Sequence, residues 1–546
     1  MTAELERVEK IIDASAITKR IELLLPAGVR PRQLKVRTLM IAMILTMLDG
    51  RDALLSNVHK TLLALPNDDQ LRLGAIAAWK TGPHTLTYRQ LEYTYRLIAN
   101  KLAKDKPDGS PSEILSEVLD RLLEASVRVL GEPASSSYAV DWTDHEAWSR
   151  PPPKTDRRST DGDTAAAASE PQPADIDAHA TADEDQQPPH NADDSSQPDR
   201  QPQRRDRRDR EAAWGHRNTN HPGRNEMFFG YYMQALTAVR DEHGPDVPEL
   251  ARRMHLASCD HDPPAQIVPV IQRMAASAIT IADLLVDSGY SYRQPQTFAL
   301  PIRQLGAQLI MDLHPNDRGT HGTHQGAIRH NGNLYCPATP NNLLELSPLP
   351  PGASPEQTQA HDRHCSELAR YKLSPITGYD PDGYRRVICP AAQAKLRCPL
   401  RPPSMTLPHD HPTIPDPPEH PPVCCTQKTI TVPPTVNAKT AQKHDYPSPQ
   451  HRSSYNRRTA AERTFATLTD RATNDLTRGW CRLTGVAPIA LLIATALIAR
   501  NIRTADAFAA RQAENARRAA NGLPPKRRRR RQRTLNHPTA TANTPP

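Results

Sequence analysis

The sequence predicts an α/β protein in which a mixed sheet is flanked by helices. An all-α N-terminal domain precedes the sheet, and a Cys/Pro-rich insertion and disordered segments interrupt the chain. Three observations lead to this prediction. Helical periodicity dominates residues 1–130. Two short apolar, β-prone runs each end in an aspartate, at Asp141 and Asp287. Long stretches rich in proline, of which the chain has 54, lack any apolar periodicity.

The composition limits the class of protein. The chain has 546 residues, enough for about two to four domains, but only 5 phenylalanines. Its mean hydropathy is −0.65, so the apolar residues must be concentrated in a few folded blocks. The formal net charge is +8. A basic balance favours an anionic partner, most often nucleic acid.

No segment predicts export or a membrane span. The N-terminus, MTAELERVEK, lacks the apolar region of a secretory signal. The apolar runs Leu39–Leu48 and Val486–Ala499 are shorter than the roughly 20 residues that a spanning helix needs. We therefore expect a soluble, cytoplasmic protein whose 8 cysteines are reduced thiols or metal ligands.

Residues 1–130 predict a helical domain. Apolar runs indicate helices over Leu34–Leu48 and Leu54–Leu65, and Thr87 with Gln90 forms a capping box for another. Such helices are consistent with a helix-turn-helix that binds DNA ends, or with a packed bundle or dimerisation element. No recognition helix stands out by base-reading residues, so both interpretations stay open.

Residues 131–314 predict the first part of the α/β domain. The run Tyr138–Val140 leads into Asp141, and a strand over Leu284–Val286 leads into Asp287 and a glycine turn. The carboxyl end of a strand is where an α/β sheet usually places a functional carboxylate. The commoner role of an aspartate after a strand is to begin a turn.

The same part of the chain holds an insertion and several further elements. Residues 151–213 have no periodicity and predict a disordered insertion. The remaining predictions are one long or two adjoining strands over Glu226–Val239, short helices over Val247–Met254 and from Ile267, and a buried strand over Ala307–Leu313.

Residues 451–505 predict a polar helix followed by a buried closing helix over Gly485–Ala499. Read as a helix, His451–Leu468 carries four side chains on one face: Tyr455, Arg458, Glu462 and Phe465. A glutamate and an arginine between two aromatic residues are unusual for a core helix. Buried glutamate is costly unless it is paired or bound to a metal.

Residues 315–450 form a Cys/His/Pro-rich insertion. A structural zinc ion needs four nitrogen or sulfur ligands. The best set combines Cys389 and Cys398 with Cys424 or Cys425, and Cys365 or His420 would complete it. The sequence has no C-x₂-C pair, so the alternative is unpaired cysteines in a loop-rich insertion.

Residues 506–546 predict a basic disordered tail containing PPKRRRRRQR. A nuclear signal is one interpretation. A solvated tail that contacts DNA without sequence preference fits a bacterial protein equally well.

Three motifs together resemble a known family. Asp141 in AVDWTD, Asp287 in LLVDSGYS and Glu462 in YNRRTAAE are similar to the Asp, Asp, Glu triad of the DDE transposases of bacterial insertion sequences. The pattern Tyr, two residues, Arg, three residues, Glu is the signature of one branch of that family. The resemblance covers about residues 131–505 and implies an RNase H-like catalytic domain. There the first Asp lies on the first strand, the second follows the fourth strand, and the Glu lies on a late helix.

The resemblance implies that Asp141, Asp287 and Glu462 are the catalytic residues and the metal ligands. Phosphodiester cleavage benefits from two divalent ions about 4 Å apart, one activating the attacking water or hydroxyl and one stabilising the leaving oxygen. Hard carboxylate oxygens suit Mg²⁺ or Mn²⁺. The residues implied to contact DNA are Tyr455, Arg458 and Arg463.

The implied function is transposition. A homo-oligomer assembled on double-stranded DNA in the bacterial cytoplasm would cut at terminal inverted repeats and join them to target DNA. Two alternatives stay open. One is a degenerate or domesticated copy that binds DNA without cutting, supported by Thr469, which stands where the family's helix carries a lysine. The other is a nuclease of the same fold without strand transfer.

Overall fold

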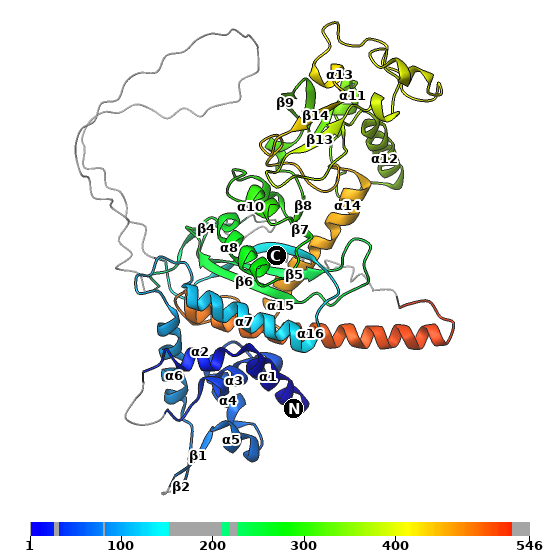
Figure 1. Ribbon diagram of the computed structural model, residues 1–546. Coiled ribbons are helices and arrows are strands. Elements are labelled where there is room, and N and C mark those ends of the chain that lie inside the picture. The colour runs from blue at the N-terminus through cyan, green and yellow to red at the C-terminus, as the bar shows by residue number, and fades with distance from the viewer. Residues whose placement is uncertain (1, 27–31, 80–81, 152–208, 218–226, 527–546) are drawn as a thin grey trace, which may run out of the picture.

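The computed structural model of the chain describes residues 2–26, 32–79, 82–151, 209–217 and 227–526 (Figure 1). Most of the insertion predicted over 151–213, and the end of the predicted tail, lie outside the described residues. Both predicted boundaries are wrong. Ala213 begins a strand because it pairs with Gly230. The tail is helical as far as Ala520, in an alanine-rich stretch of high helix propensity.

A six-stranded mixed sheet lies at the centre of the molecule (Figure 1). Its strands are β3 (Ser137–Glu146), β4 (Ala213–His216), β5 (Met227–Val239), β6 (Ala251–Ser258), β7 (Asp283–Val286) and β8 (Gln308–Met311). The order is β4-β5-β3-β7-β8, and β6 pairs with the part of β5 that follows the residues paired with β4. β3, β4 and β6 run antiparallel to β5, whereas β7 and β8 run parallel to β3. The prediction of an α/β protein with a mixed sheet is confirmed.

The register between β3 and β7 positions the two aspartates. Ser137 pairs with Asp283 and Ala139 with Leu285. Two residues further in the same register, Asp141 is level with Asp287. The prediction that the first strand ends at Asp141 is wrong, because β5 continues to pair with β3 as far as Glu146. Asp141 therefore lies in the middle of a strand, at the point where its parallel neighbour ends.

Sequence periodicity identified β5, β7 and the helix α8 (Pro263–Ala276) correctly but failed for β6. Val247–Met254 was predicted to be a helix, whereas Ala251–Ser258 is a strand. All eight residues of β6 are buried, because α7 and α16 cover one face of the sheet and α8 covers the other. A strand covered on both faces shows no alternation of polar and apolar residues.

The N-terminal part is helical apart from one hairpin. Its helices are α1 (Thr2–Ser15), α2 (Ile17–Glu22), α3 (Val36–Leu48), α4 (Leu55–Leu63), α5 (Asn67–Leu73), α6 (Tyr88–Leu102) and α7 (Glu113–Leu130). The predicted capping box is present, with the Thr87 side chain accepting from the Gln90 amide. The antiparallel hairpin of β1 (Ile76–Trp79) and β2 (Gly82–Thr85) was not predicted.

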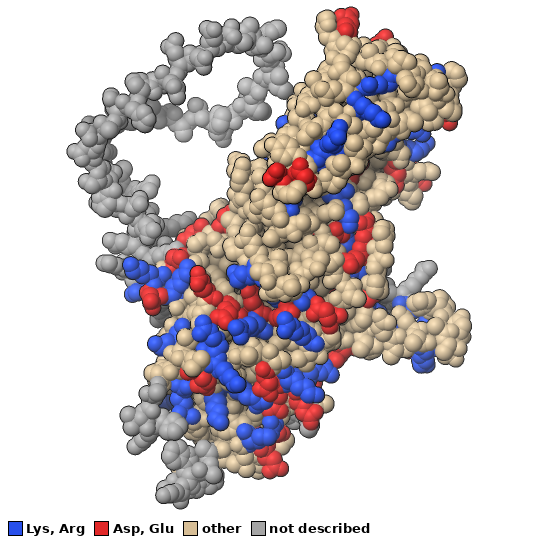
Figure 2. Space-filling model, viewed as in Figure 1, with Lys and Arg blue, Asp and Glu red and all other residues tan. Residues whose placement is uncertain are grey.

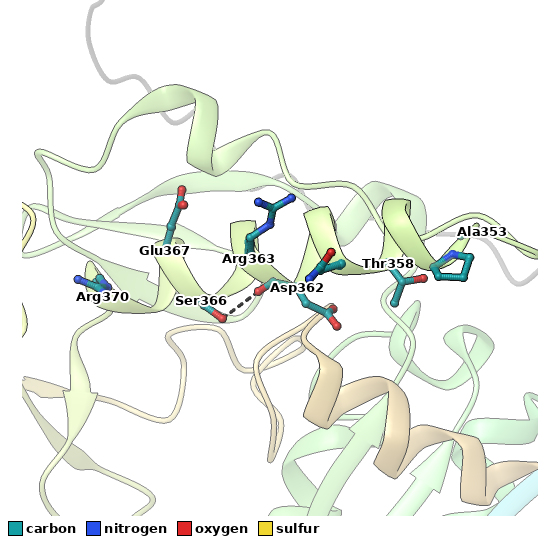
Figure 3. A pocket seen from close by; sticks show the side chains of 9 residues that line it. Ala353, Thr358, Asp362, Arg363, Ser366, Glu367 and Arg370 are labelled. Carbon is teal, nitrogen blue, oxygen red and sulfur yellow. Dashed lines mark hydrogen bonds between the residues drawn. The ribbon is translucent and has the colours of Figure 1, made fainter.

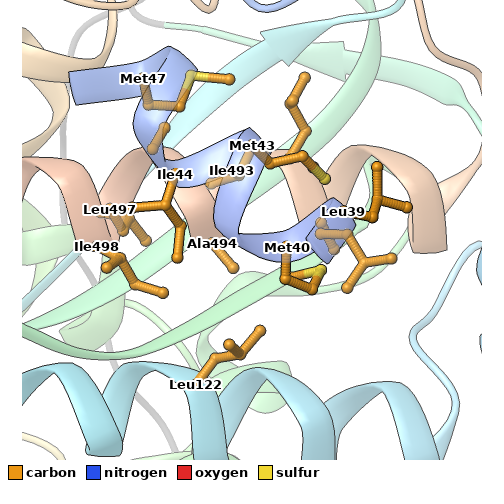
Figure 4. Close-up of a cluster of buried hydrophobic side chains, with 14 of the residues drawn as sticks. Leu39, Met40, Met43, Ile44, Met47, Leu122, Ile493, Ala494, Leu497 and Ile498 are labelled. Carbon is orange, nitrogen blue, oxygen red and sulfur yellow. The ribbon is translucent and has the colours of Figure 1, made fainter. Parts of the chain in front are cut away.

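The closing helix α16 (Val486–Ala520) organises the main core. Gly485–Ala499 was predicted, but the helix has 35 residues, and its C-terminal part projects from the body (Figure 1). Its N-terminal part packs against α3 and α7, where Ile493 and Leu497 lie close to Met40 and Ile44 (Figure 4). By length and hydropathy alone α16 could span a membrane, but 89% of its most apolar 18-residue window is buried inside the protein. The N-terminal helices thus already cover apolar surface of α16.

The insertion over 315–450 is folded and lies at the opposite end of the molecule from the N-terminal helices (Figure 1). One three-stranded sheet contains β9 (Thr320–His324), β10 (Ala327–His330) and β11 (Asn333–Tyr335). The other contains β12 (Ser374–Pro375), β13 (Arg385–Ile388) and β14 (Thr429–Val432). Its helices are α11 (Asn341–Leu344), α12 (Pro355–Arg370) and α13 (Val423–Thr426).

Four short helices complete the region around the sheet: α9 (Ser288–Ser291), α10 (Ala299–Gln304), α14 (Pro449–Tyr455) and α15 (Thr459–Leu468). The helix predicted over His451–Leu468 is therefore broken, because the 3₁₀ turn Asn456–Arg458 separates α14 from α15. In this turn Arg457 points inwards and donates to Asp283 and to Ser454 Oγ, at 3.1 and 2.6 Å.

Candidate active site

The face of the sheet that carries the two aspartates also packs against α15. Successive side chains of a strand point to opposite faces, so Ala139 and Asp141 share one face. Ala139 and Leu285 form a buried cluster with Ala460 and Ala461 of α15. Because both alanines are small, α15 lies close to the sheet. The residues at its N-terminal end are thereby brought to the two aspartates.

Arg458 joins the glutamate to the first aspartate. Its guanidinium donates to Asp141 Oδ2 at 2.8 Å and to Glu462 Oε1 at 2.5 Å. It also lies over the ring of Tyr455, 5.5 Å from the ring centroid. Three of the four side chains predicted to share a helix face thus surround one acidic cluster. The fourth, Phe465, is buried in the main core.

The second aspartate is held by the turn that follows β7. Asp287 caps α9, and its Oδ1 accepts from the Gly289 amide at 3.0 Å. Gly289 lies against the indole of Trp142, such that an added Cβ would be 2.3 Å from Trp142 Cη2. A glycine is required there by this close approach of the ring. Trp142 in turn packs edge-on against Tyr290, at 4.7 Å between ring centroids.

Neighbouring carboxylates and burial shift the pKa values in the cluster. Burial and the neighbouring Asp287 raise the pKa of Asp141 to about 7, although Arg458 opposes this. Burial likewise raises the pKa of Asp287. Burial lowers the pKa of Arg458, but Tyr455 and the surrounding carboxylates outweigh this effect and raise it overall. Arg458 therefore stays charged and neutralises a site made of carboxylate oxygens, the donor set that Mg²⁺ and Mn²⁺ prefer.

A third strand end contributes a carboxylate that the sequence prediction missed. Asp312 directly follows β8, and it raises the pKa of Asp287 after the larger effect of burial. Its Oδ1 accepts from the Tyr446 hydroxyl at 2.7 Å and from Arg318 at 3.3 Å. The signal was present, because the predicted strand Ala307–Leu313 carries an aspartate near its end, as the strands before Asp141 and Asp287 do.

Arg463 and Thr469, which follow Glu462 in the chain, lie apart from the acidic cluster. Arg463, predicted to contact DNA, donates to Glu249 at 2.6 and 2.9 Å. Thr469 caps the C-terminus of α15, and its hydroxyl donates to the Phe465 carbonyl at 3.2 Å. Neither side chain contacts Asp141, Asp287 or Glu462 in the part of the chain that the structure describes.

The predicted zinc ligands divide into two groups. Cys389, Cys398 and the adjacent Cys424 and Cys425 are all buried within the insertion. Of the two alternatives for the fourth ligand, Cys365 lies on α12 beside His361, with 3.5 Å between Sγ and Nδ1, and His420 is exposed. Among the described residues, no three His, Cys, Asp or Glu side chains already have the arrangement of a bound metal ion.

A shallow hollow along α12 lies outside the acidic cluster (Figure 3). Thr358, Asp362, Ser366 and Arg370 project along it from one helix, and Ser366 donates to the Asp362 carbonyl at 2.8 Å. Asp362 also accepts from Arg452 of α14 at 2.6 Å. This contact fixes the insertion to the helix that precedes Arg458.

Gly289→Ala is expected to lower the free energy of unfolding by about 1–3 kcal/mol, because the new methyl group cannot fit beside the Trp142 ring. Thermal and denaturant unfolding would measure the change. Gly378→Ala is the matched control, because a Cβ there meets nothing within 4 Å, and we expect a change of no more than about 0.5 kcal/mol. Equal stabilities of the two variants would contradict the close packing of Trp142.

No family model, curated protein or solved structure compared with the chain matches it. The functional assignment therefore depends on the geometry of the site itself. Asp141 on β3 is level with Asp287, which directly follows the parallel strand β7, and one arginine links Asp141 to Glu462 on α15.

Proposed function

We propose that this protein is a DDE transposase that cleaves DNA at the ends of its insertion element and joins those ends to target DNA. The observation that carries the proposal is the meeting of Asp141, Asp287 and Glu462 around Arg458. Asp141 and Glu462 bind its guanidinium directly. Asp287 is close enough that Arg458 opposes the rise in its pKa that burial causes.

The order of elements supports an RNase H-like catalytic domain. The antiparallel strands β3, β5 and β6 are followed by the helix α8 and by the parallel strands β7 and β8. Asp141 lies on β3, and Asp287 follows β7, which is the fourth strand when the four-residue edge strand β4 is left out; Glu462 lies on a later helix. These are the positions that the resemblance to DDE transposases implies.

The three carboxylates have the chemistry to hold two Mg²⁺ or Mn²⁺ ions. Bound there, the ions would activate the attacking water or hydroxyl and stabilise the leaving oxygen. The Asp141 side chain is 13% exposed and Asp287 is partly buried, so their charges are screened less than those of surface carboxylates. Arg458 partly neutralises them. Its planar guanidinium, which lies over the Tyr455 ring, also has the shape to bind a DNA phosphate through two parallel hydrogen bonds.

The proposed partner is double-stranded DNA, bound by a homo-oligomer in the bacterial cytoplasm. The net charge of +8 supports an anionic partner. On the face shown in Figure 2, basic and acidic side chains are interspersed over the N-terminal helices, and charged side chains are sparser on the insertion. Ion pairs such as Arg37 with Asp13 account for this mixture. The N-terminal helices pack against α16, and their binding to DNA ends stays a prediction.

The test is a cleavage assay on labelled DNA carrying the repeats that flank the gene, with Mg²⁺ or Mn²⁺. We expect the wild type to cut and join these ends, and Glu462→Ala to do neither. Glu249→Ala is the matched control, because that glutamate pairs with Arg463 of the same helix, which makes no hydrogen bond to the acidic cluster among the described residues. We expect it to cut like the wild type.

Each other outcome identifies a different function. DNA binding without any cleavage by the wild type would indicate a degenerate or domesticated copy. Nicked products without joined products would indicate a nuclease of the same fold. Equal cleavage by the wild type and Glu462→Ala would exclude the proposed site.

A further inference from the structure

The insertion gathers five buried cysteines from four separate segments. Three of them precede a proline at the end of an element or in a turn: Cys336 after β11, Cys389 after β13, and Cys398. The other two, Cys424 and Cys425, lie on α13. Each of the five is less than a tenth exposed. Cys336 was not part of the zinc set predicted from the sequence.

The cysteine side chains are close enough to influence one another. Burial raises the pKa of Cys336 to about 12, and the thiols of Cys425, Cys389 and Cys398 add to this effect. Burial also raises the pKa of Cys398, with contributions from Cys389 and Cys425. The packing agrees, because Cys336, Cys389 and Cys398 belong to one buried cluster, and the Cys389 amide donates to the Lys428 carbonyl at 3.1 Å, three residues after Cys425. Cys336, Cys389, Cys398 and Cys425 therefore form one group, contributed by the two small sheets, a loop and α13.

The backbone around this group is arranged for sulfur anions. The Ala338 amide donates to the Cys336 sulfur, and the Leu400 amide donates to the Cys398 sulfur. In both turns the donor lies two residues after the cysteine, on the far side of a proline. A hydrogen bond from an N–H group stabilises a thiolate more than a thiol, and such contacts orient the ligands of metal sites.

Two buried guanidinium nitrogens of Arg401 lack the anion that their position requires. The Nε and Nη2 atoms of Arg401 are inaccessible to solvent and have no hydrogen-bond partner among the described residues. Arg401 acts to lower the pKa of both Cys425 and Cys398, so its charge lies beside the group of thiols. A buried cation is costly unless it is paired. Neutral thiols give it no such partner, whereas a thiolate cluster carries a negative charge.

We propose that Cys336, Cys389, Cys398 and Cys425 bind one structural zinc ion in the insertion, with Arg401 as the neighbouring positive charge. On binding, the four thiols lose four protons to solvent and four Zn–S bonds form, which gives a tetrathiolate centre with two net negative charges. The ion would connect β11, β13, the turn at Cys398 and α13, which otherwise belong to two separate small hydrophobic clusters.

The adjacent residues Cys424 and Cys425 have different roles in the proposed site. The Cys424 thiol donates to the Cys425 sulfur, which lowers the pKa of Cys425. Arg401 acts in the same direction on Cys425. Cys424 Sγ also lies against Gly326, 3.6 Å from the position of a Cβ added there, before β10. We therefore assign Cys425 to the ion and Cys424 to a supporting position beside it. Because the two are neighbours on α13, they provide a matched pair of variants.

The test measures the zinc content of the purified full-length protein by mass spectrometry of the metal, without any activity assay. We expect one zinc per chain in the wild type and in Cys365→Ser and Cys424→Ser, and none in Cys336→Ser or Cys425→Ser. Replacement of zinc by Co²⁺ should give the strong visible absorption of a tetrahedral cobalt thiolate in the same three proteins. Circular dichroism and limited proteolysis would show whether each variant remains folded outside the insertion.

Three results would overturn the proposal. The first is a wild type that holds no zinc and gives no cobalt thiolate spectrum when Co²⁺ is added. The second is full zinc retention by Cys336→Ser. The third is loss of zinc from Cys424→Ser with retention by Cys425→Ser, which would exclude the proposed ligand set. None of these measurements involves DNA. A failure of the zinc proposal is therefore distinguishable from a failure of the proposed transposase activity.

Discussion

Asp141→Asn is expected to abolish metal-dependent DNA cleavage while leaving the protein folded. Removal of one metal-binding carboxylate should cost about 10³-fold in rate, or about 4 kcal/mol of transition-state stabilisation. The asparagine keeps the shape of the side chain and can still accept from the Trp142 amide, as Asp141 does at 2.9 Å. Single-turnover cleavage of labelled ends would measure the loss, and wild-type rates in this variant would exclude Asp141 from the site.

The unfolding temperature of Asp141→Asn is the control for correct folding. It should also depend on pH differently from that of the wild type. Burial and Asp287 raise the pKa of Asp141 to about 7, above its unfolded value of 3.8. The folded state therefore holds this proton more tightly than the unfolded state does, so the wild type loses stability as pH rises from about 4 to 7. Asp141→Asn should lack that loss and, at pH 8, unfold at a temperature equal to or above that of the wild type.

The same proton must leave before Asp141 can bind a cation. We therefore expect the increase in unfolding temperature caused by Mn²⁺ to be small at pH 6 and larger at pH 8 in the wild type. In Asp141→Asn this dependence should be much weaker. Thermal unfolding with increasing Mn²⁺ at the two pH values would measure it, and identical Mn²⁺ responses of the wild type at both would contradict the raised pKa.

Glu124→Gln is expected to give the largest loss of stability, about 3–5 kcal/mol. Glu124 on α7 is buried and pairs with two buried arginines of β6, Arg252 at 2.7 Å and Arg253 at 2.8 Å. The neutral amide would leave two charges inside the protein with too little compensation. Denaturant unfolding would measure the change.

Glu117→Gln is the control on the same helix. Glu117 pairs with Arg20 and Arg121 at the surface and is 33% exposed, so we expect a loss below about 1 kcal/mol. If both glutamine variants lost the same small amount of stability, the ion pairs of Glu124 with Arg252 and Arg253 would stabilise the folded protein no more than the surface pairs of Glu117 do.

Acid is expected to destabilise the protein in part by protonating Glu124. Burial alone would raise the pKa of Glu124, but the hydrogen bonds from Arg252 and Arg253 outweigh it and lower the pKa to about 2. A lowered pKa stabilises the folded state above the unfolded value of 4.5. As pH falls from 4.5 towards 2, the wild type should lose about 3 kcal/mol from this group. Glu124→Gln should show less of this loss.

The parts of the fold that the sequence predicted correctly depend on neighbours in the chain. The capping box at Thr87, the apolar run that became α3 and the strand that leads into Asp287 are local patterns. The spacing of Tyr455, Arg458 and Glu462 is local as well. For this reason it survived the break between α14 and α15, which the sequence did not predict.

The errors share a physical cause, because each depends on a partner that is distant in the chain. β6 was predicted to be a helix because helices cover both of its faces and remove the alternation that marks a strand. The strand predicted to end at Asp141 was too short, because pairing with β5 determines where β3 ends. Cys336 and Asp312 were missed because only the folding of the insertion and the sheet brings them to the other cysteines and to Asp287.

By itself, therefore, the sequence determined which residue types carry the proposed chemistry and the local elements that present them. Only the tertiary structure decided that Asp141 and Asp287 are level on neighbouring strands and that Arg458 joins Asp141 to Glu462. Strand register and helix packing are set by the burial of apolar surface across the whole domain. Such contacts join residues hundreds of positions apart, and no local pattern of residues specifies them.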